Sequence, residues 1–187
     1  MKRGLSLAAV IALTFGIAVT SFAAAACTSG ADPDSVVVTE LSGAMPELSG
    51  EDLLGGSVAP DDYRGRAVVV NFWATWCGPC RREQPVLSQA DRSAGEHGPV
   101  FVGVNYRDDP AAARQYLEEF DVAYPSLEDP AGSLAYDFDV PFLPATIFID
   151  PDGQLRYRVV GAIDEHRLEQ ILTEITGSAL DEPSGAT

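Results

Sequence analysis

Basic residues are scarce in this sequence, which has 12 lysines and arginines against 28 aspartates and glutamates. The only lysine is Lys2, and we expect it to be removed with Arg3 during export. The remaining 10 basic and 28 acidic residues give a formal net charge near −18. A surface this acidic argues against nucleic acid and anionic lipid headgroups as partners, because both carry negative phosphates. Solubility is a sufficient reason for the charge.

Metal-ligating and phosphate-binding patterns are also missing. The chain has three cysteines and two histidines, and it lacks internal repeats, a glycine-rich phosphate loop and a Ser/His/Asp arrangement. A zinc site at Cys77 and Cys80 would need two more ligands. The remaining candidates, His97, His166 and Cys27, do not form a zinc-knuckle pattern. We therefore expect neither a metal nor a cofactor.

The stretch VVVNFWATWCGPCRREQP, residues 68–85, predicts a buried strand that leads directly into a helix. Its first six residues are mostly β-branched or aromatic, as in a strand that is buried on both faces. Pro79 suits the first turn of a helix, where its missing N–H would have no partner. The two cysteines of this stretch therefore stand at a strand–helix junction.

Cys77 is expected to be a nucleophile because it precedes the first helical turn. Unpaired backbone N–H groups and the helix dipole stabilise a thiolate there, and Arg81 and Arg82 add positive charge. With two residues between them, Cys77 and Cys80 are close enough to form a reducible disulfide. We expect Cys77 to be the exposed nucleophile and Cys80 the shielded resolving thiol. A purely structural disulfide would gain little from so short a loop.

The segment NFWATWCGPC resembles thioredoxin-fold proteins, and CGPC is the thioredoxin-type motif. The longer segments RGRAVVVNFWATWCGPCRREQPVL and VPFLPATIFIDPDGQL are similar to the membrane-tethered TlpA/ResA/DsbE group of thiol–disulfide oxidoreductases. The resemblance covers most of residues 40–176. It implies an α/β, thioredoxin-like fold with a central mixed β-sheet flanked by helices, N-terminal strands and a central strand–helix insertion.

The resemblance also implies a proton carrier for the resolving cysteine. Thioredoxin uses a buried aspartate on the strand before the motif, but this chain has Asn71 there, which cannot titrate. The TlpA/ResA group attributes the role to a glutamate three residues after the second cysteine, here Glu83. Cys80 and Glu83 share one helix face, and burial would raise the carboxyl pKa enough for proton exchange with the thiol. The alternative is that Glu83 is a solvated helix charge.

A client-binding surface is implied around Pro144, which aligns with the thioredoxin-fold cis-proline. In that fold the backbone of the preceding residue, here Leu143, pairs with an extended substrate segment. The residues alone leave a trans proline in a loop as the alternative. The family usually has threonine where this chain has Ala145. Trp76 borders Cys77 and lies, in the family, on the rim where partner proteins dock.

The amino-terminal sequence predicts an exported protein. Residues 1–26 combine a basic start with an uncharged apolar run of signal-peptide length. The small residues before Cys27 resemble a lipoprotein signal, in which Cys27 becomes lipidated and anchors the chain to the membrane. Ordinary secretion and an uncleaved anchor are the alternatives. We expect residues 27–36 to be a flexible tether, 37–177 the thioredoxin-like domain and 178–187 a disordered tail.

The hydrophobic pattern predicts further elements around the central strand. Aspartate caps and proline mark two helix starts, at Asp109 and Asp164. We expect one long helix, Gly78–Ala94, and a single helical turn, Leu134–Phe138. Val36–Thr39 and Glu47–Val58 are expected to form short N-terminal strands ahead of the main sheet, with a hairpin as one arrangement. The remaining strands are expected at Val100–Tyr106, Tyr124–Leu127, Thr146–Ile149 and Gln154–Val160.

The function indicated is thiol–disulfide exchange outside the cytoplasm: Cys77 attacks a partner disulfide and Cys80, helped by Glu83, resolves the intermediate. The resemblance implies a reductant in cytochrome c maturation, with apocytochrome c as client and a membrane thiol protein as electron donor. Oxidation of exported proteins is the alternative. A peroxidase would need a PxxxTxxC pattern, which is absent at Cys77. A copper carrier would use three residues between the cysteines and a distal histidine.

Overall fold

The computed structural model describes residues 35–177. The expected signal peptide (1–26), the lipidation site Cys27, most of the expected tether (27–36) and the expected tail (178–187) lie outside the described residues. Among residues 35–177 no helix combines the length and apolar character needed to cross a membrane.

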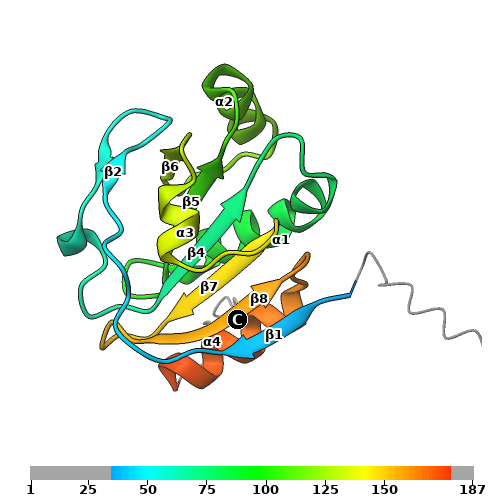
Figure 1. Cartoon of the computed structure of the whole chain (residues 1–187). Coiled ribbons are helices and arrows are strands. Elements are labelled where there is room, and N and C mark those ends of the chain that lie inside the picture. The colour runs from blue at the N-terminus through cyan, green and yellow to red at the C-terminus, as the bar shows by residue number, and fades with distance from the viewer. Residues whose placement is uncertain (1–34, 178–187) are drawn as a thin grey trace, which may run out of the picture. The chain divides into compact units, whose positions relative to one another are not determined.

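A six-stranded mixed sheet forms the centre of the described domain, in the order β1-β8-β7-β4-β5-β6 (Figure 1). β4 runs parallel to β5, and β5 parallel to β6, whereas the pairs β4–β7, β7–β8 and β8–β1 are antiparallel. The predicted thioredoxin-like α/β fold is confirmed. The strands are β1 (Val37–Glu40), β4 (Val68–Trp73), β5 (Val100–Tyr106), β6 (Ser126–Asp129), β7 (Ala145–Ile149) and β8 (Leu155–Val160).

β4 is fully enclosed because it has neighbours on both edges and a hydrophobic core on each face. All six of its residues are buried. Since side chains alternate along a strand, Val69 and Trp73 enter one core, whereas Val70 and Phe72 enter the other. Asn71 shares the face of Trp73, so it carries its amide into the first core.

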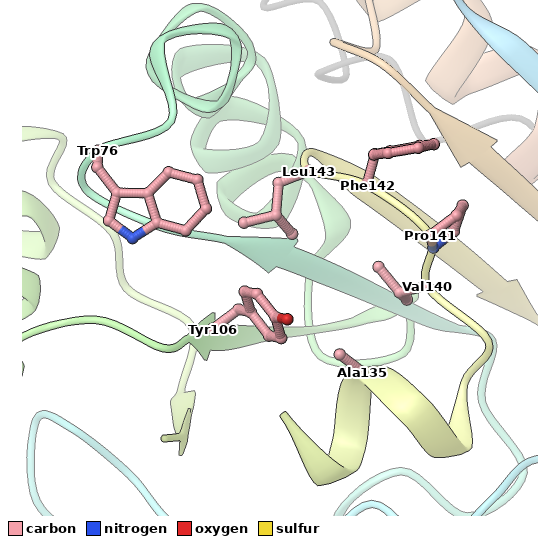
Figure 2. Close-up of a pocket in the computed structure, with 7 residues that line it drawn as sticks. All are labelled: Trp76, Tyr106, Ala135, Val140, Pro141, Phe142 and Leu143. Atoms are coloured by element: carbon pink, nitrogen blue, oxygen red, sulfur yellow. The ribbon is translucent and has the colours of Figure 1, made fainter. Parts of the chain in front are cut away.

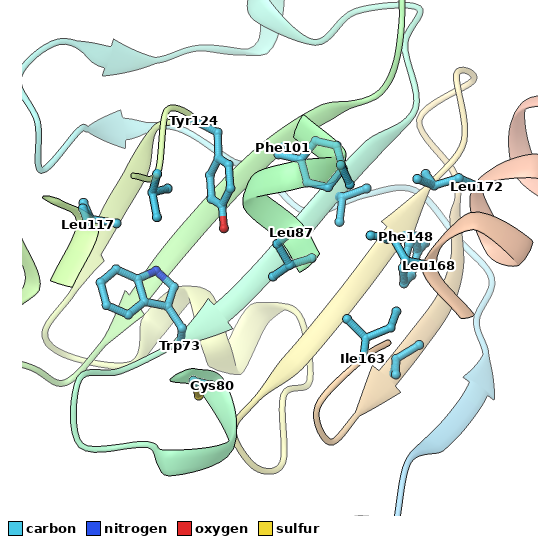
Figure 3. Close-up of a cluster of buried hydrophobic side chains, with 14 of the residues drawn as sticks. Trp73, Cys80, Leu87, Phe101, Leu117, Tyr124, Phe148, Ile163, Leu168 and Leu172 are labelled. Atoms are coloured by element: carbon cyan, nitrogen blue, oxygen red, sulfur yellow. The ribbon is translucent and has the colours of Figure 1, made fainter. Parts of the chain in front are cut away.

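Helices cover both faces of the sheet. α1 (Gly78–Ala94), α2 (Pro110–Glu119) and α4 (Glu165–Thr176) contribute buried side chains to the first core, the one that contains the cysteines (Figure 3). The short helix α3 (Ser133–Asp137) contributes Ala135 to the second core. A six-residue central strand thus supplies residues to both hydrophobic layers and ends at the cysteine motif.

The helix boundaries follow the capping residues. The Asp109 side chain accepts the N–H of Ala112 at 2.9 Å, and that of Asp164 accepts the N–H of Arg167 at 2.7 Å. α1 ends before Gly95, whose φ of 64° is unfavourable for residues with a side chain. The predicted bounds of α1 and both predicted aspartate caps are confirmed.

Two strand predictions need correction. β1 joins the main sheet beside β8, whereas only β2 (Gly50–Glu51) and β3 (Ser57–Val58) form a separate hairpin, followed by the 3-10 turn η1 (Pro60–Asp62). β6 begins at Ser126, two residues later than expected. Tyr124 lies before this strand, and its ring packs on Phe101 in the first core, with centroids 5.9 Å apart.

Gly103 of β5 is a test of how closely the first core is packed. A Cβ atom there would lie 2.2 Å from Ser126 Oγ and 2.9 Å from Trp73 Nε1. We expect Gly103→Ala to lower the free energy of unfolding by about 1–3 kcal/mol, as overpacking does. Chemical denaturation would measure it. Gly78→Ala is the control, because a Cβ at Gly78 meets nothing within 4 Å; equal stability of the two variants would contradict the prediction.

Candidate active site

A disulfide joins Cys77 and Cys80 at the start of α1, as the motif predicts. Cys77 is the N-cap residue and Cys80 lies in the first helical turn. The sulfur of Cys77 accepts the backbone N–H of Cys80 at 3.2 Å. A hydrogen bond from the helix and the positive end of its dipole both favour negative charge on this sulfur once the disulfide opens.

The exposure of the two sulfurs differs less than expected. Cys77 is 4% exposed and Cys80 is 1% exposed. The predicted order is confirmed, but the expectation of an exposed Cys77 is wrong for this oxidised state, because both cysteines belong to the first core. Trp76, just before the motif, is 61% exposed, and Gly78 within it is exposed too. Trp76 is therefore far more accessible than either sulfur.

Arg81 contributes less free charge to the site than the sequence suggests. Its guanidinium forms an ion pair with Glu119 and lies over the rings of Tyr116 and Phe120, 5.4 Å and 4.9 Å from their centroids. These contacts attach the first turn of α1 to α2. The charge of Arg81 is therefore offset by Glu119, whereas the helix N-terminus acts directly on Cys77, its cap residue.

Glu83 is a buried carboxylate and not a solvated helix charge. Its side chain is 1% exposed. Oε1 accepts the side-chain amide of Asn71 at 2.8 Å, and Oε2 accepts the backbone N–H of Ile163 at 2.9 Å. Burial raises the pKa of Glu83 to about 8, although the hydrogen bonds from Ile163 and Asn71 oppose the shift. The carboxyl can therefore gain and lose a proton near neutral pH.

Asn71 links this carboxyl to the strand that follows the proline. Besides Glu83, its amide nitrogen donates to Thr146 Oγ1 on β7 at 3.2 Å. Asn71 Oδ1 is buried and has no hydrogen-bond partner among the described residues. The position that carries an aspartate in thioredoxin therefore holds a neutral donor in this chain, and its partner is the carboxyl on α1.

The peptide bond between Leu143 and Pro144 is cis, as the resemblance implies. Pro144 is buried, and its carbonyl accepts the N–H of Gly161 at 2.9 Å. Leu143 is half-buried.

An apolar groove of about 340 Å³ lies between Trp76 and this proline loop (Figure 2). Phe142, at its edge, is 74% exposed. The sequence indicated Trp76 and Leu143 as members of this surface, but it did not indicate Tyr106 or Ala135, which come from β5 and α3. The groove is lined by Trp76, Tyr106, Ala135, Val140, Pro141, Phe142 and Leu143.

Two further residues contact the cysteine loop, which we define as Thr75–Cys80, and sequence reasoning missed both. Asp108 accepts hydrogen bonds from Thr75, and the Tyr116 hydroxyl donates to the carbonyl of Cys80. Each is more than 30 positions from its partner, so no local pattern could have indicated the contact. The run Asp108-Asp109-Pro110 predicted a helix cap, and Asp109 fills that role.

The described residues contain no group of three His, Cys, Asp or Glu side chains arranged to hold a metal ion. His97 and His166 are both exposed.

A disulfide-bonded cysteine pair at the start of the helix that follows a central strand, together with a cis-proline before the adjacent strand β7, is the arrangement of a thioredoxin-fold redox protein. The Redoxin family profile matches residues 41–172 of this chain. The chain therefore belongs to the Redoxin family.

Named relatives agree with this class. The chain is 38% identical over 123 residues to the thiol:disulfide interchange protein DsbE of Pseudomonas aeruginosa, covering 65% of this chain and 66% of that protein. It is 45% identical over 122 residues to DsbE of Pseudomonas fluorescens, covering 65% and 64%. It thus spans about two thirds of the length of these relatives. Thiol-disulfide oxidoreductase ResA of Bacillus subtilis is 27% identical over 176 residues, covering 94% and 92%.

Solved structures show the same fold. A secreted Mycobacterium tuberculosis disulfide oxidoreductase, homologous to E. coli DsbE, superposes with a TM-score of 0.62 at 25% identity, covering 68% of this chain and 96% of its own. MTB DsbF, solved in mixed oxidised and reduced forms, gives a TM-score of 0.64 at 31% identity, covering 71% and 99%.

The raised pKa of Glu83 predicts a specific pH dependence of stability. A glutamate in the unfolded chain titrates at a pH of about 4.3, and Glu83 in the folded chain at about 8. Between these values the folded chain keeps a proton that the unfolded chain releases. The contribution of Glu83 to the free energy of unfolding is therefore greatest below a pH of about 4.3 and falls by about 1.4 kcal/mol per pH unit until about pH 8.

Glu83→Gln removes this dependence. Urea unfolding of the oxidised protein from pH 4 to 9 should give a wild-type minus variant difference that declines with pH and levels off above pH 8. A difference that is flat across this range would contradict the burial of an ionisable Glu83.

Proposed function

We propose that this chain is an extracytoplasmic thiol–disulfide oxidoreductase that exchanges disulfides with partner proteins through Cys77 and Cys80. The observation that carries the proposal is the Cys77–Cys80 disulfide at the N-terminus of α1, where the helix supplies both a hydrogen bond and its dipole to the attacking sulfur. The names of the DsbE and ResA relatives describe the same class of reaction.

The reduced enzyme transfers two electrons to its client. The Cys77 thiolate attacks one sulfur of a client disulfide, a mixed disulfide forms, and the displaced client sulfur leaves as a thiolate that takes up a proton. Cys80 then loses its proton and attacks the Cys77 sulfur, which releases the second client thiolate and forms the Cys77–Cys80 disulfide. The same steps in reverse oxidise a client dithiol.

Glu83 is suited to take the Cys80 proton during resolution. The two residues lie on one face of α1, and a carboxyl with a pKa of about 8 is close to the pKa of about 8.5 of an ordinary thiol. Asn71 fits both states of the carboxyl: its Nδ2 donates to the ionised form, and after rotation of the amide its unpartnered Oδ1 can accept from the protonated form.

The groove beside Trp76 is the surface on which a client segment binds. Its lining is uncharged and it opens at two exposed aromatic side chains, Trp76 and Phe142. An extended client segment lying between Trp76 and the Leu143–Pro144 loop would pair with the backbone of Leu143 and bring its own sulfur to Cys77.

The physiological role that we propose is reduction in cytochrome c maturation, with apocytochrome c as client and a membrane thiol protein as electron donor. The domain acts outside the cytoplasm, lipid-anchored through Cys27 after removal of residues 1–26. The names of the DsbE and ResA relatives support thiol–disulfide exchange, and the secreted M. tuberculosis protein supports a location outside the cytoplasm. Oxidation of exported proteins uses the same residues in reverse and is the alternative.

The reduction potential of the cysteine pair separates these two roles. We expect a value near −270 mV or lower, as in thioredoxin, because a reductant must hold its disulfide more tightly than its client does. Equilibration with glutathione or dithiothreitol, followed by alkylation and mass measurement, gives the value. A potential of about −120 to −180 mV would instead identify an oxidant or isomerase of exported proteins.

Glu83→Gln should slow resolution without slowing the first attack. The variant has no proton acceptor beside Cys80, so we expect roughly 10²-fold slower release of glutathione from a Cys77–glutathione mixed disulfide. Stopped-flow measurements should also lose the inflection near pH 8. Glu169→Gln, an exposed position on α4, is the control. A resolution rate equal to wild type from pH 6 to 9 would rule out Glu83 as the proton carrier.

A further inference from the structure

Asp108, in the segment that joins β5 to α2, accepts two hydrogen bonds from Thr75, which lies shortly before Cys77. Asp108 Oδ2 accepts the backbone N–H of Thr75 at 2.5 Å, and Oδ1 accepts the Thr75 hydroxyl at 2.8 Å. Thr75 lies between the end of β4 and Cys77. One carboxylate thus determines both the backbone and the side-chain position of the residue two places before the nucleophile.

Asp108 is itself held from two further sides. Asn105 Nδ2 donates to Oδ2 at 3.0 Å, and the backbone N–H of Asp109 donates to Oδ1 at 2.9 Å. Each carboxylate oxygen therefore accepts two hydrogen bonds. Partial burial opposes ionisation of Asp108, but the hydrogen bonds from Thr75, Asn105 and Asp109 outweigh it and lower its pKa. The group remains charged across the pH range in which thiols react.

The backbone turn at Arg107 determines the direction of the Asp108 side chain. Arg107 has a φ of 47°, a left-handed conformation that is costly for a residue with a side chain. Its N–H donates to Asp129 O at 3.1 Å, and its guanidinium donates to Ala131 O at 3.0 Å. The surrounding structure therefore stabilises a backbone conformation that directs the next residue toward Thr75.

Tyr116 holds the other end of the cysteine motif. It is buried, and its hydroxyl donates to the carbonyl of Cys80 at 3.2 Å. Its ring stacks on Trp73, the last residue of β4, with centroids 4.5 Å apart. Asp108 and Tyr116 thus contact the chain before Cys77 and at Cys80; Asp108 lies just before α2, and Tyr116 lies on it.

We propose that Asp108 and Tyr116 are positioning residues that keep the two cysteines in place after the disulfide is reduced. In the oxidised state the covalent bond between the sulfurs holds Cys77 and Cys80 together. In the reduced state only noncovalent contacts hold the loop, so loss of a contact destabilises the reduced protein more. This inference rests on the proposed redox function of the pair, and it assigns to the segment from Asp108 through α2 the role of stabilising the reduced form.

The test is the redox equilibrium of Asp108→Asn and Tyr116→Phe in the full chain. Equilibration with oxidised and reduced dithiothreitol should show about tenfold less reduced protein for Asp108→Asn, a potential about 30 mV lower. Tyr116→Phe loses one hydrogen bond, and we expect about a threefold shift. Urea unfolding of each redox form should show the same factor as extra destabilisation of the reduced form, which closes the thermodynamic cycle.

Neighbouring residues supply matched controls. Asp109→Ala removes the cap of α2 without touching the loop, so it should destabilise both redox forms equally and leave the equilibrium unchanged. Thr75→Ser keeps both donors to Asp108 and should resemble wild type. Thr75→Val keeps the backbone N–H that bonds Asp108 but loses the hydroxyl. It replaces Asp108→Asn in the test if that variant does not fold.

Equal destabilisation of the two redox forms, with an unshifted equilibrium in both Asp108→Asn and Thr75→Val, would overturn the assignment of Asp108. An unshifted equilibrium in Tyr116→Phe would overturn that of Tyr116. Neither measurement involves a client protein. If the protein reduces no protein disulfide but the variants show these shifts with dithiothreitol, the proposed function is wrong and the positioning role is supported.

Discussion

The burial of one carboxyl group, that of Glu83, is the constraint on which the site depends. A charged group inside a hydrophobic core is costly unless polar groups compensate it. Here compensation comes from Asn71 on β4 and from the backbone of Ile163 before α4, while Asn71 also bonds Thr146 on β7. The helix that carries the cysteines is therefore connected, through one carboxyl, to the sheet and to the last helix. The partial compensation leaves the proton on Glu83 labile near neutral pH.

The cysteine loop is held from a second direction by the β5–α2 segment. Glu83 connects α1 to the sheet, whereas Asp108 and Tyr116 contact the residues on either side of Cys77, Thr75 and Cys80. The nucleophilic sulfur lies between these two sets of contacts and is itself 4% exposed. Because contacts on both sides hold the loop, the proposed mechanism places the client in the groove beside Trp76, next to the loop.

Sequence reasoning recovered what local pattern determines and missed what distant contacts determine. The bounds of α1 follow from Cys77, Pro79 and Gly95, all of which act within one helical turn. The burial of Glu83 followed from its spacing to Cys80 together with the family resemblance. The pairing of β1 with β8, more than 100 positions away, and the Asp108–Thr75 contact have no local signature. The burial of Cys77 was also missed, because a helix N-cap position says nothing about the side chains that cover it.

The position of the charges explains why the two sulfurs have different tasks. The N-terminus of α1 favours negative charge on Cys77, which caps the helix. Cys80 lies deeper, on the same helix face as Glu83, where two negative charges in one buried region would repel strongly. In the proposed mechanism, negative charge on Cys80 is therefore disfavoured while Glu83 is ionised, whereas the helix N-terminus favours the thiolate on Cys77. Cys80 would then become nucleophilic when Glu83 takes its proton, after a mixed disulfide has formed on Cys77. The order of the two steps follows from where the helix ends and from where the carboxyl is buried.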